Sequence, residues 1–353
     1  MTLGSPRSVR VRVHYPLEHG TIVLRTEDDW EKNVEPVAAG GSVFEFRLEL
    51  TRPYLYFKPV LLDGTGPQWS TGENLLLLAS GRPLREVYPH FVGDAGCSAC
   101  TLRELDGHHF RVFYPPGYAE NTLKRYPVLY MQDGQNLFFP GEAFGGNHWK
   151  VPETLAILDR MNAIEEILVV GIYPRERTVE YTQPGWESYG RFLVDTLKPA
   201  IDAEYRTLPQ PERTGVMGSS LGGVVSLYLH WQFPQVFGKA ACLSSTFGWR
   251  DDLRARVLEE PRRPGMLYLD SGWPADNYEV TRDLRGLLVE RGYHEGQDLL
   301  YFAFPEARHS ELAWAMRCHI PLQFFFSHGG RELVGEKSAS TLDPAGFRDL
   351  SLD

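Results

Sequence analysis

GSSLG, at residues 218–222, decides the fold class that this sequence predicts. The pentapeptide has the pattern G-x-S-x-G, follows the apolar run Thr214–Met217 and precedes the apolar stretch Val224–Phe233, which stops at Pro234. A strand, a turn and a helix in this order hold a serine in a strained backbone conformation. A side chain two positions before or after it would collide with the flanking helix or strand. Ser220 is therefore the first candidate nucleophile.

The sequence beyond residue 98 alternates between short apolar runs and longer helix-like stretches. The expected strands are Phe110–Tyr114, Val128–Met131, Ile167–Ile172, Thr214–Met217, Ala240–Leu243, Met266–Leu269 and Leu299–Phe302. The expected helices, beside the one after Ser220, are Trp149–Met161, Tyr189–Tyr205, Asn277–Arg291 and Glu311–Phe326. This alternation predicts an α/β fold with a doubly wound, mainly parallel sheet that helices cover on both faces. In such sheets, sites lie at the carboxyl ends of the strands.

The segment 8–78 has the alternating period of strands, with turn-forming clusters such as AGGS and DGTG between them. It predicts a small all-β sandwich, whose layout resembles the immunoglobulin-like modules that accompany glycan-active enzymes and that precede enterobactin-type esterases. Trp30 and Trp69 are interpreted as core residues of this sandwich, because large aromatics are mostly buried. Exposed rings that stack on sugars, giving the module a carbohydrate-binding or lid role, are the alternative. We therefore expect a sandwich at 1–90, a catalytic α/β domain at 91–328 and a polar tail at 329–353.

Composition and charge exclude several classes of partner. The 353 residues are 42% hydrophobic and 23% charged, which is typical of a soluble globular protein. A net charge of −10 disfavours nucleic acid, because binding of polyanions needs clustered Lys and Arg. No tract of 18 apolar residues predicts a membrane span, and the N-terminal residues lack the apolar core of a secretory signal. We expect a cytoplasmic protein with a small-molecule partner.

The four cysteines give no indication of a metal or redox centre. Cys97 and Cys100 form a C-x-x-C pair, but a zinc site needs a second ligand pair and a redox motif needs a thioredoxin-like βαβ context. A disulfide between them stays open. Cys242 and Cys318 lie in apolar segments and are expected in the core.

Two aspartates compete for the role of the acid that orients a catalytic base. The acid and the histidine are expected downstream of the serine, in that order. Asp270 and Asp276 both follow the expected strand Met266–Leu269. Asp276 is preferred, since a loop carboxylate reaches a histidine loop more easily, whereas Asp270 at the strand end is suited to accept backbone N–H groups.

His309 is the preferred base. It follows the expected strand Leu299–Phe302, so that it falls on a loop at the carboxyl edge of the sheet, while His294 and His319 are rivals without that position. For the oxyanion hole, the backbone N–H of Leu221 is one expected donor. Gln135 is the other, because Gly134 lets the loop after Val128–Met131 approach the substrate.

Four segments in order, YPVLYMQDGQNLF, RTVEYTQP, GVMGSSLGGVVSLYLHWQFPQVFGKAACLSS and EARHSELAW, carry a family resemblance. They resemble the esterase D or enterochelin-esterase-like family of the α/β-hydrolase superfamily, over roughly residues 100–328. The resemblance implies triad roles for Ser220, Asp276 and His309 and oxyanion roles for Leu221 and Gln135. It also places Arg177, Glu180 and Tyr181 near the mouth of the site as substrate-binding candidates, to which we add Trp273 in the acid loop.

The predicted activity is that of a serine carboxylic-ester hydrolase that works through an acyl-enzyme, without a metal or organic cofactor. Aryl or acyl esters, including sugar-linked feruloyl or acetyl esters, are the favoured substrates. A siderophore trilactone is the alternative. An acidic chain attracts a highly anionic complex poorly, unless a local cluster near Arg175 and Arg177 overrules the net charge. A non-catalytic carbohydrate-binding protein that has kept the hydrolase fold is the alternative from another class.

Overall fold

The computed structural model describes residues 5–93 and 100–327, which form two compact units. The first unit takes in the described residues up to Gly93 together with Gly117–Lys124, and the second comprises the remaining residues up to Ser327. No sequence pattern indicated that Gly117–Lys124 packs with the first unit. The side-chain amide of Asn121 donates to the carbonyls of His14 and Pro89, at 2.9 and 2.8 Å. The predicted tail at 329–353 and Cys97 lie outside the described residues.

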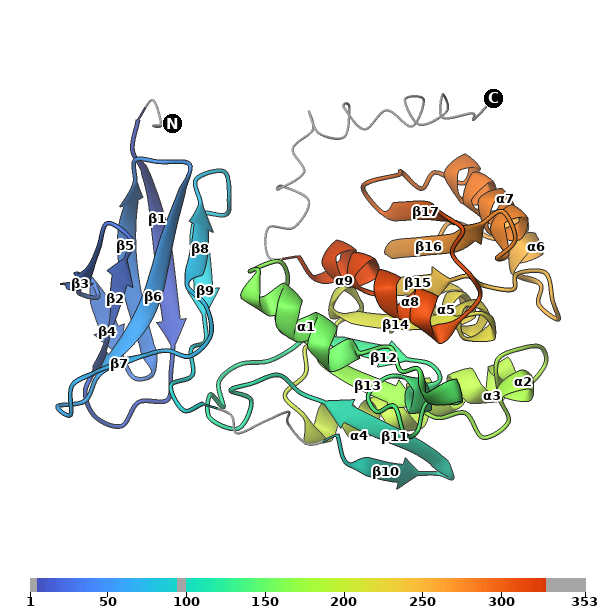
Figure 1. Ribbon diagram of the computed structural model, residues 1–353, viewed down its shortest axis with the longest axis horizontal. Helices are drawn as coiled ribbons and strands as arrows, with labels where there is room; N and C mark the ends of the chain where they lie inside the picture. Colours follow the sequence, from blue (N-terminus) through green and yellow to red (C-terminus); the bar gives the residue numbers. More distant parts are fainter. Residues whose placement is uncertain (1–4, 94–99, 328–353) are drawn as a thin grey trace. The chain divides into compact units, whose positions relative to one another are not determined.

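The first unit is a sandwich of two sheets (Figure 1). One sheet has the order β4 (Ala38–Gly40), β5 (Val43–Leu50), β1 (Arg7–His14), β9 (Leu84–Val87). The other has the order β3 (Asp29–Val34), β2 (Thr21–Thr26), β6 (Tyr54–Leu62), β7 (Pro67–Trp69), and β8 (Leu75–Leu78) also pairs with β6. Alternate residues of facing strands, such as Val11, Leu24 and Phe57, are buried between the sheets. The alternation read from the sequence thus corresponds to one buried face per sheet.

The two sandwich tryptophans are not core residues, which corrects the preferred interpretation. Trp69 is 39% exposed and Trp30 is half-buried. Their rings meet edge to face with centroids 6.2 Å apart, and the Arg25 guanidinium lies 5.1 Å from the Trp69 ring. Because Trp69 pairs with Val60 across β6 and β7, it shares the outer face of the sheet with that residue, outside the sandwich core. A carbohydrate-binding role for these rings stays a prediction.

The second unit has an α/β fold built on an eight-stranded sheet. Its order is β10 (Leu102–Leu105), β11 (His108–Phe113), β13 (Leu168–Ile172), β12 (Val128–Met131), β14 (Thr214–Ser219), β15 (Lys239–Leu243), β16 (Met266–Trp273), β17 (Leu299–Pro305). Six neighbouring strands of this order, β13, β12, β14, β15, β16 and β17, are parallel to one another. The remaining two, β10 and β11, pair antiparallel. The predicted doubly wound, mainly parallel sheet is confirmed. Only β10 has no counterpart among the strands expected from the sequence.

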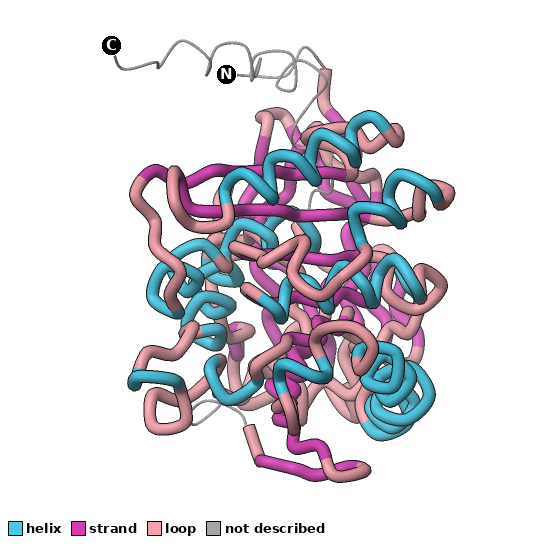
Figure 2. The backbone as a smooth tube through the Cα atoms, turned by 90° about the vertical axis from the view of Figure 1, so that its right-hand side faces the viewer, coloured by secondary structure: helices cyan, strands magenta, loops and turns pink. Residues whose placement is uncertain are grey.

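Helices lie on both sides of this sheet (Figure 2). On one face, α1 (Val151–Arg160), α8 (Glu311–Arg317) and α9 (His319–Phe326) share a core with the strands. The helix after Ser220 is α5 (Leu221–Gln232), and α7 (Tyr278–Glu290) is the expected helix near Asn277–Arg291. Cys242 and Cys318 are buried as expected. Within residues 5–93 and 100–327, no helix is both long and apolar enough to cross a membrane.

Two predicted helices are subdivided in the structure. The stretch Tyr189–Tyr205 comprises the end of α3 (Trp186–Arg191), a π-helical turn at Phe192–Leu197, and α4 (Lys198–Glu204). The stretch Glu311–Phe326 is divided at Cys318 into α8 and α9. The short helices α2 (Arg177–Glu180) and α6 (Leu253–Glu259) were not expected, because neither is long enough to show an apolar period.

We expect the stability of the fold to fall in mild acid because of His230 in α5. Its imidazole is fully buried with Nδ1 2.8 Å from the Phe237 carbonyl, and burial lowers its pKa to about 4. Below about pH 6.5 the His230 imidazole binds a proton in the unfolded chain but stays neutral in the folded chain. The contribution present above that pH is therefore lost progressively down to about pH 4, by up to about 3 kcal/mol.

Urea unfolding at neutral pH and at about pH 5 measures this loss. A His230→Gln variant, which has no titrating ring, is expected to lose less stability between the two pH values than the wild-type protein. Equal losses in the two proteins would assign the acid sensitivity to other groups.

Candidate active site

Ser220 lies on the turn between β14 and α5, with φ 56° and ψ −123°. A non-glycine residue rarely adopts this conformation, and here the surrounding glycines make it attainable. A Cβ on Gly218 would lie 2.5 Å from the backbone of Gly222, and one on Gly223 would lie 1.9 Å from Ser245 Oγ. A Cβ on Gly222 would make a tight 3.1 Å contact with Gln132. The expected collision is therefore confirmed two positions before Ser220, at Gly218. Two positions after it, at Gly222, the contact is tight, and the collision on that side occurs at Gly223 instead.

Asp276, rather than Asp270, contacts His309. His309 Nδ1 lies 2.6 Å from Asp276 Oδ1, and the His309 ring packs edge-on against Trp314 at 4.9 Å. Asp276 is almost fully buried, while the His309 side chain is 40% exposed. The loop after β16 thus brings its carboxylate to the loop after β17, as the sequence predicted for Asp276.

Asp270 is fully buried within β16, which continues to Trp273 rather than ending at Leu269 as expected, and it has different partners. Tyr268 donates its hydroxyl proton to Asp270 Oδ2 at 2.8 Å, and the Ser244 N–H donates to Asp270 Oδ1 at 3.2 Å. Arg317 Nη2 lies 3.1 Å from the same Oδ1. Asp270 therefore accepts a backbone N–H, as the preferred interpretation expected, and is in addition the counter-ion of a buried arginine.

The two aspartates differ in pKa because their surroundings differ. Burial raises the pKa of Asp270 to about 6, in spite of the nearby Arg317. Burial acts in the same direction on Asp276, but hydrogen bonds from His309 and Ser244 outweigh it and hold the pKa of Asp276 below its ordinary value. Asp276 is thus a carboxylate throughout the neutral range and can accept a hydrogen bond from the Nδ1–H of His309.

The rival bases lie elsewhere. His294 precedes β17, so it lies toward the amino end of that strand, opposite the edge that carries Ser220. His319 is the exposed first residue of α9. His309 is the histidine that follows a parallel strand at the carboxyl edge, and this position brings it to Asp276.

Of the three residues expected at the mouth of the site, Arg177 lines the pocket around Ser220. Its guanidinium binds the Asp133 carboxylate in a bidentate pair at 2.8 and 2.9 Å. Glu180 and Tyr181 are buried, which corrects the expectation that they contact substrate. Glu180 pairs with His108 at 3.0 Å, and Tyr181 accepts the Asp133 N–H at 3.0 Å. Tyr181 thus supports the Arg177–Asp133 pair from behind, with the Arg177 guanidinium 5.4 Å from its ring, whereas Glu180 accepts the Arg175 N–H at 3.0 Å.

The oxyanion candidates belong to the two elements predicted for them. Leu221 is the first residue of α5 and lines the pocket, and Gln135 lies in a short 3-10 turn, Gly134–Asn136, after β12. A glycine is needed at position 134 for a different reason from the one expected, because a Cβ there would lie 2.5 Å from the backbone of Gly171 in β13. The glycine thus permits close packing of the turn on the sheet.

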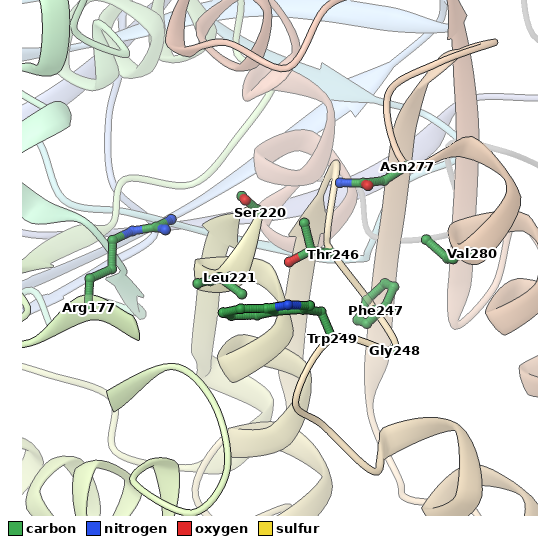
Figure 3. A pocket seen from close by; sticks show the side chains of 9 residues that line it. All are labelled: Arg177, Ser220, Leu221, Thr246, Phe247, Gly248, Trp249, Asn277 and Val280. Atoms are coloured by element: carbon green, nitrogen blue, oxygen red, sulfur yellow. The ribbon is translucent and has the colours of Figure 1, made fainter. Parts of the chain in front are cut away.

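A cavity of about 540 Å³ opens at Ser220 (Figure 3). Its lining residues are Arg177, Ser220, Leu221, Thr246, Phe247, Gly248, Trp249, Asn277 and Val280. In Figure 3 the Trp249 ring reaches beneath Leu221 and Thr246, between Arg177 and Phe247. Sequence reasoning missed the loop 246–249, although it follows β15 at the carboxyl edge, where the general rule for parallel sheets expects a site.

Trp273 lies at the end of β16 with 46% of its surface exposed, and it is not among the residues that line this cavity. Its role in substrate binding stays a prediction. Among the described residues, no group of three His, Cys, Asp or Glu side chains is arranged to hold a metal ion.

Comparison with known proteins gives a family match and several relatives. The family model described as "Putative esterase" matches residues 106–294. The uncharacterized protein YbbA of Bacillus subtilis is 25% identical over 213 residues, which are 53% of this chain and 80% of that protein.

Among solved structures, the enterobactin esterase FES of Shigella flexneri, determined in the presence of enterobactin, has a TM-score of 0.54 at 15% identity. The match covers 92% of this chain and 94% of that one. A ferulic acid esterase has a TM-score of 0.50 at 17% identity and covers 62% of this chain and 92% of its own. These likenesses show the α/β-hydrolase fold.

Proposed function

Since this chain belongs to the esterase family that its residues 106–294 match, we propose that this carboxylic ester hydrolase works through Ser220, His309 and Asp276. The observation that carries the proposal is the 2.6 Å contact between His309 Nδ1 and Asp276 Oδ1, at the edge of the sheet where Ser220 lines a cavity. The three residues follow β14, β16 and β17 in the order serine, acid, histidine. Family membership disfavours the non-catalytic alternative.

The mechanism follows from the proton inventory of these groups. An ionised Asp276 accepts a hydrogen bond from the Nδ1–H of His309, so that Nδ1 keeps its proton and Nε2 carries the lone pair. Nε2 takes the Ser220 proton as Oγ forms a bond to the ester carbonyl carbon. The imidazolium then gives that proton to the departing alkoxide as its C–O bond breaks. Water, activated by the same nitrogen, hydrolyses the acyl-enzyme and restores Ser220.

The developing oxyanion needs donors that are in place before the reaction. The Leu221 N–H lies at the N-terminus of α5, where backbone N–H groups and the helix dipole favour negative charge. The Gln135 N–H, from the turn after β12, is the proposed second donor. Each such donor contributes about 3 kcal/mol to the stability of the transition state.

The lining of the cavity favours an aryl or acyl ester, with sugar-linked feruloyl and acetyl esters included. Trp249 and Phe247 supply aromatic surface, and Val280 supplies aliphatic surface. Arg177 is the charged residue of the lining, and Asp133 already binds its guanidinium. A flat, mainly apolar acyl group with few polar substituents fits this chemistry best.

A panel of esters tests the proposal. The kcat/KM values for methyl ferulate, p-nitrophenyl acetate, acetylated xylan and a siderophore trilactone are compared at equal enzyme concentration. We expect the aryl or the short acyl ester to be the best substrate. No activity on any of the four, or undiminished activity in a Ser220→Ala variant, would contradict the proposal.

We expect Trp249→Ala to raise KM for methyl ferulate about tenfold, because the variant removes an aromatic surface on which the substrate ring packs. The expected kcat for p-nitrophenyl acetate is close to wild type. Leu258→Ala is the matched control, since Leu258 on α6 is as exposed as Trp249, at 47% each, and does not line the cavity. Equal KM values in Trp249→Ala and the wild-type protein would exclude Trp249 from the substrate site.

A siderophore trilactone is the second candidate, because the likeness to the Shigella enterobactin esterase extends over 92% of this chain and so over both units. The pairing of the nearby arginines disfavours this substrate. Arg177 is bound to Asp133, and Arg175 lies 3.6 Å from Glu180. Carboxylates therefore neutralise the local cations that an anionic ferric complex would need.

A further inference from the structure

A buried arginine lies behind the Asp276–His309 pair. Arg317, the last residue of α8, has a side chain that is 5% exposed. Its Nη2 lies 3.1 Å from Asp270 Oδ1 and donates to Ser244 Oγ at 2.7 Å, and its guanidinium faces the Phe304 ring at 5.1 Å. Within the described residues, Nε and Nη1 have no hydrogen-bond acceptor. The polar contacts of this cation are therefore concentrated on Asp270 and Ser244.

Ser244 connects the cation to Asp276. Because the Ser244 hydroxyl accepts from Arg317, its one proton is directed to Asp276 Oδ2, 2.5 Å away. The Gly272 N–H donates to the same Oδ2 at 3.1 Å, while Oδ1 faces His309. Both oxygens of Asp276 thus have assigned partners, and the carboxylate cannot rotate without breaking several hydrogen bonds.

The position of Ser244 matters as much as its hydroxyl. Ser244 follows β15, whose Leu243 pairs with Ser219 and accepts the Ser220 N–H at 2.9 Å. Asp276 follows β16, one strand farther from the nucleophile. The bond from Ser244 therefore holds the acid over the end of the strand that adjoins β14.

We propose that Arg317 is a positioning residue for the triad: its charge, balanced by Asp270, orients the Ser244 hydroxyl, which fixes the Asp276 carboxylate toward His309. The inference rests on the proposed function of Ser220, His309 and Asp276. It gives Asp270 a function of its own, as the counter-ion that makes a buried guanidinium tolerable at this place.

Ser244→Ala tests the connection while leaving the Arg317–Asp270 pair in place. We expect kcat for p-nitrophenyl acetate to fall by about 10- to 100-fold, with KM changed by less than about twofold. The acid limb of the kcat/KM profile should move to higher pH. Without the Ser244 bond Asp276 is a stronger base, and it then stabilises the His309 imidazolium more. Asp270, Arg317 and Glu311 are the other charged groups around the pair, and all three are unchanged in this variant.

Variants of Arg317 test the source of the orientation. Arg317→Met alone leaves Asp270 charged and buried and can prevent folding, so the double variant Arg317→Met/Asp270→Asn is used beside it. We expect the double variant to fold and to show the same fall in kcat as Ser244→Ala. Arg317→Lys keeps the charge and should recover part of the activity. Leu322→Ala, on the buried face of α9, is the control for lost stability with normal kcat.

An NMR titration of the His309 imidazole separates this inference from the proposed function. A shift of the His309 titration and loss of its Nδ1 proton signal in Ser244→Ala and in the double variant would support positioning, whether or not the protein turns over esters. Folded variants with the His309 titration and kcat of the wild-type protein would overturn it. An inactive wild-type protein, or an active Ser220→Ala variant, would instead overturn the proposed function.

Discussion

Replacing Ser220 with alanine is expected to lower kcat for p-nitrophenyl acetate by about 10⁴-fold or more. In the proposed mechanism the variant removes the atom that forms the acyl-enzyme, and only oxyanion stabilisation and substrate binding then remain. Because Ser220 is held at φ 56° by tight packing around Gly218 and Gly223, the smaller alanine should keep the turn intact. Steady-state kinetics and denaturant unfolding of the same preparations measure both expectations.

Ser226→Ala is the matched control for this variant. Ser226 is fully buried in the same helix, α5, and donates its hydroxyl to the Gly222 carbonyl at 2.7 Å. Its replacement also removes one buried hydroxyl, and we expect kcat to stay near wild type. Loss of activity in both variants would indicate damage to α5, whereas full activity of Ser220→Ala would remove Ser220 from the mechanism.

Asp276→Asn is expected to lower kcat by about 10⁴-fold at neutral pH while the protein remains folded. An amide at this position donates to His309 Nδ1 and holds the imidazole in the tautomer whose Nε2 is protonated, so it cannot accept the Ser220 proton. The loss should be in kcat, because Asp276 is not among the residues that line the cavity.

Asp270→Asn distinguishes the two aspartates. Asp270 lies 3.1 Å from the buried Arg317, so its neutralisation leaves an unpaired cation and is expected to destabilise the fold by about 3–5 kcal/mol. The folded fraction should turn over far faster than Asp276→Asn. Urea unfolding and active-site titration separate stability from turnover, and a larger fall in kcat for Asp270→Asn would transfer the role of the acid to Asp270.

Much of the α/β unit could be predicted because its strands are buried on both faces and read as short apolar runs. Val128–Met131 is the clearest example, since the predicted strand and β12 have the same bounds. The antiparallel strand β10 was missed because its residues alternate between exposed and half-buried positions. The outer-face position of Trp69 was missed for a related reason, since composition favours burial of tryptophan whichever face of a sheet it occupies.

The contacts of the site depended on distances in three dimensions that no sequence spacing gives. Asp270 lies within β16 and Asp276 follows that strand, and only the path of the loop brings Asp276 to His309. Glu180 and Tyr181 share a short segment with Arg177, yet α2 turns their side chains into the protein and leaves Arg177 at the cavity. The loop 246–249 lines the cavity because it follows β15, the strand beside β14. No sequence motif marks this position, so sequence reasoning did not find it.

The sequence by itself determined the glycine-lined turn at Ser220 and the parallel sheet, and it predicted the chain order of the proposed triad, because glycine requirements and apolar periods are local properties of a chain. The tertiary structure decided which aspartate meets His309, which residues line the cavity at Ser220, and that Arg317 stands behind the acid through Ser244. These contacts join the ends of neighbouring strands to one another and to α8, which follows them in the chain. Packing alone sets their distances, and in a buried site those distances decide which charges pair and which protons move.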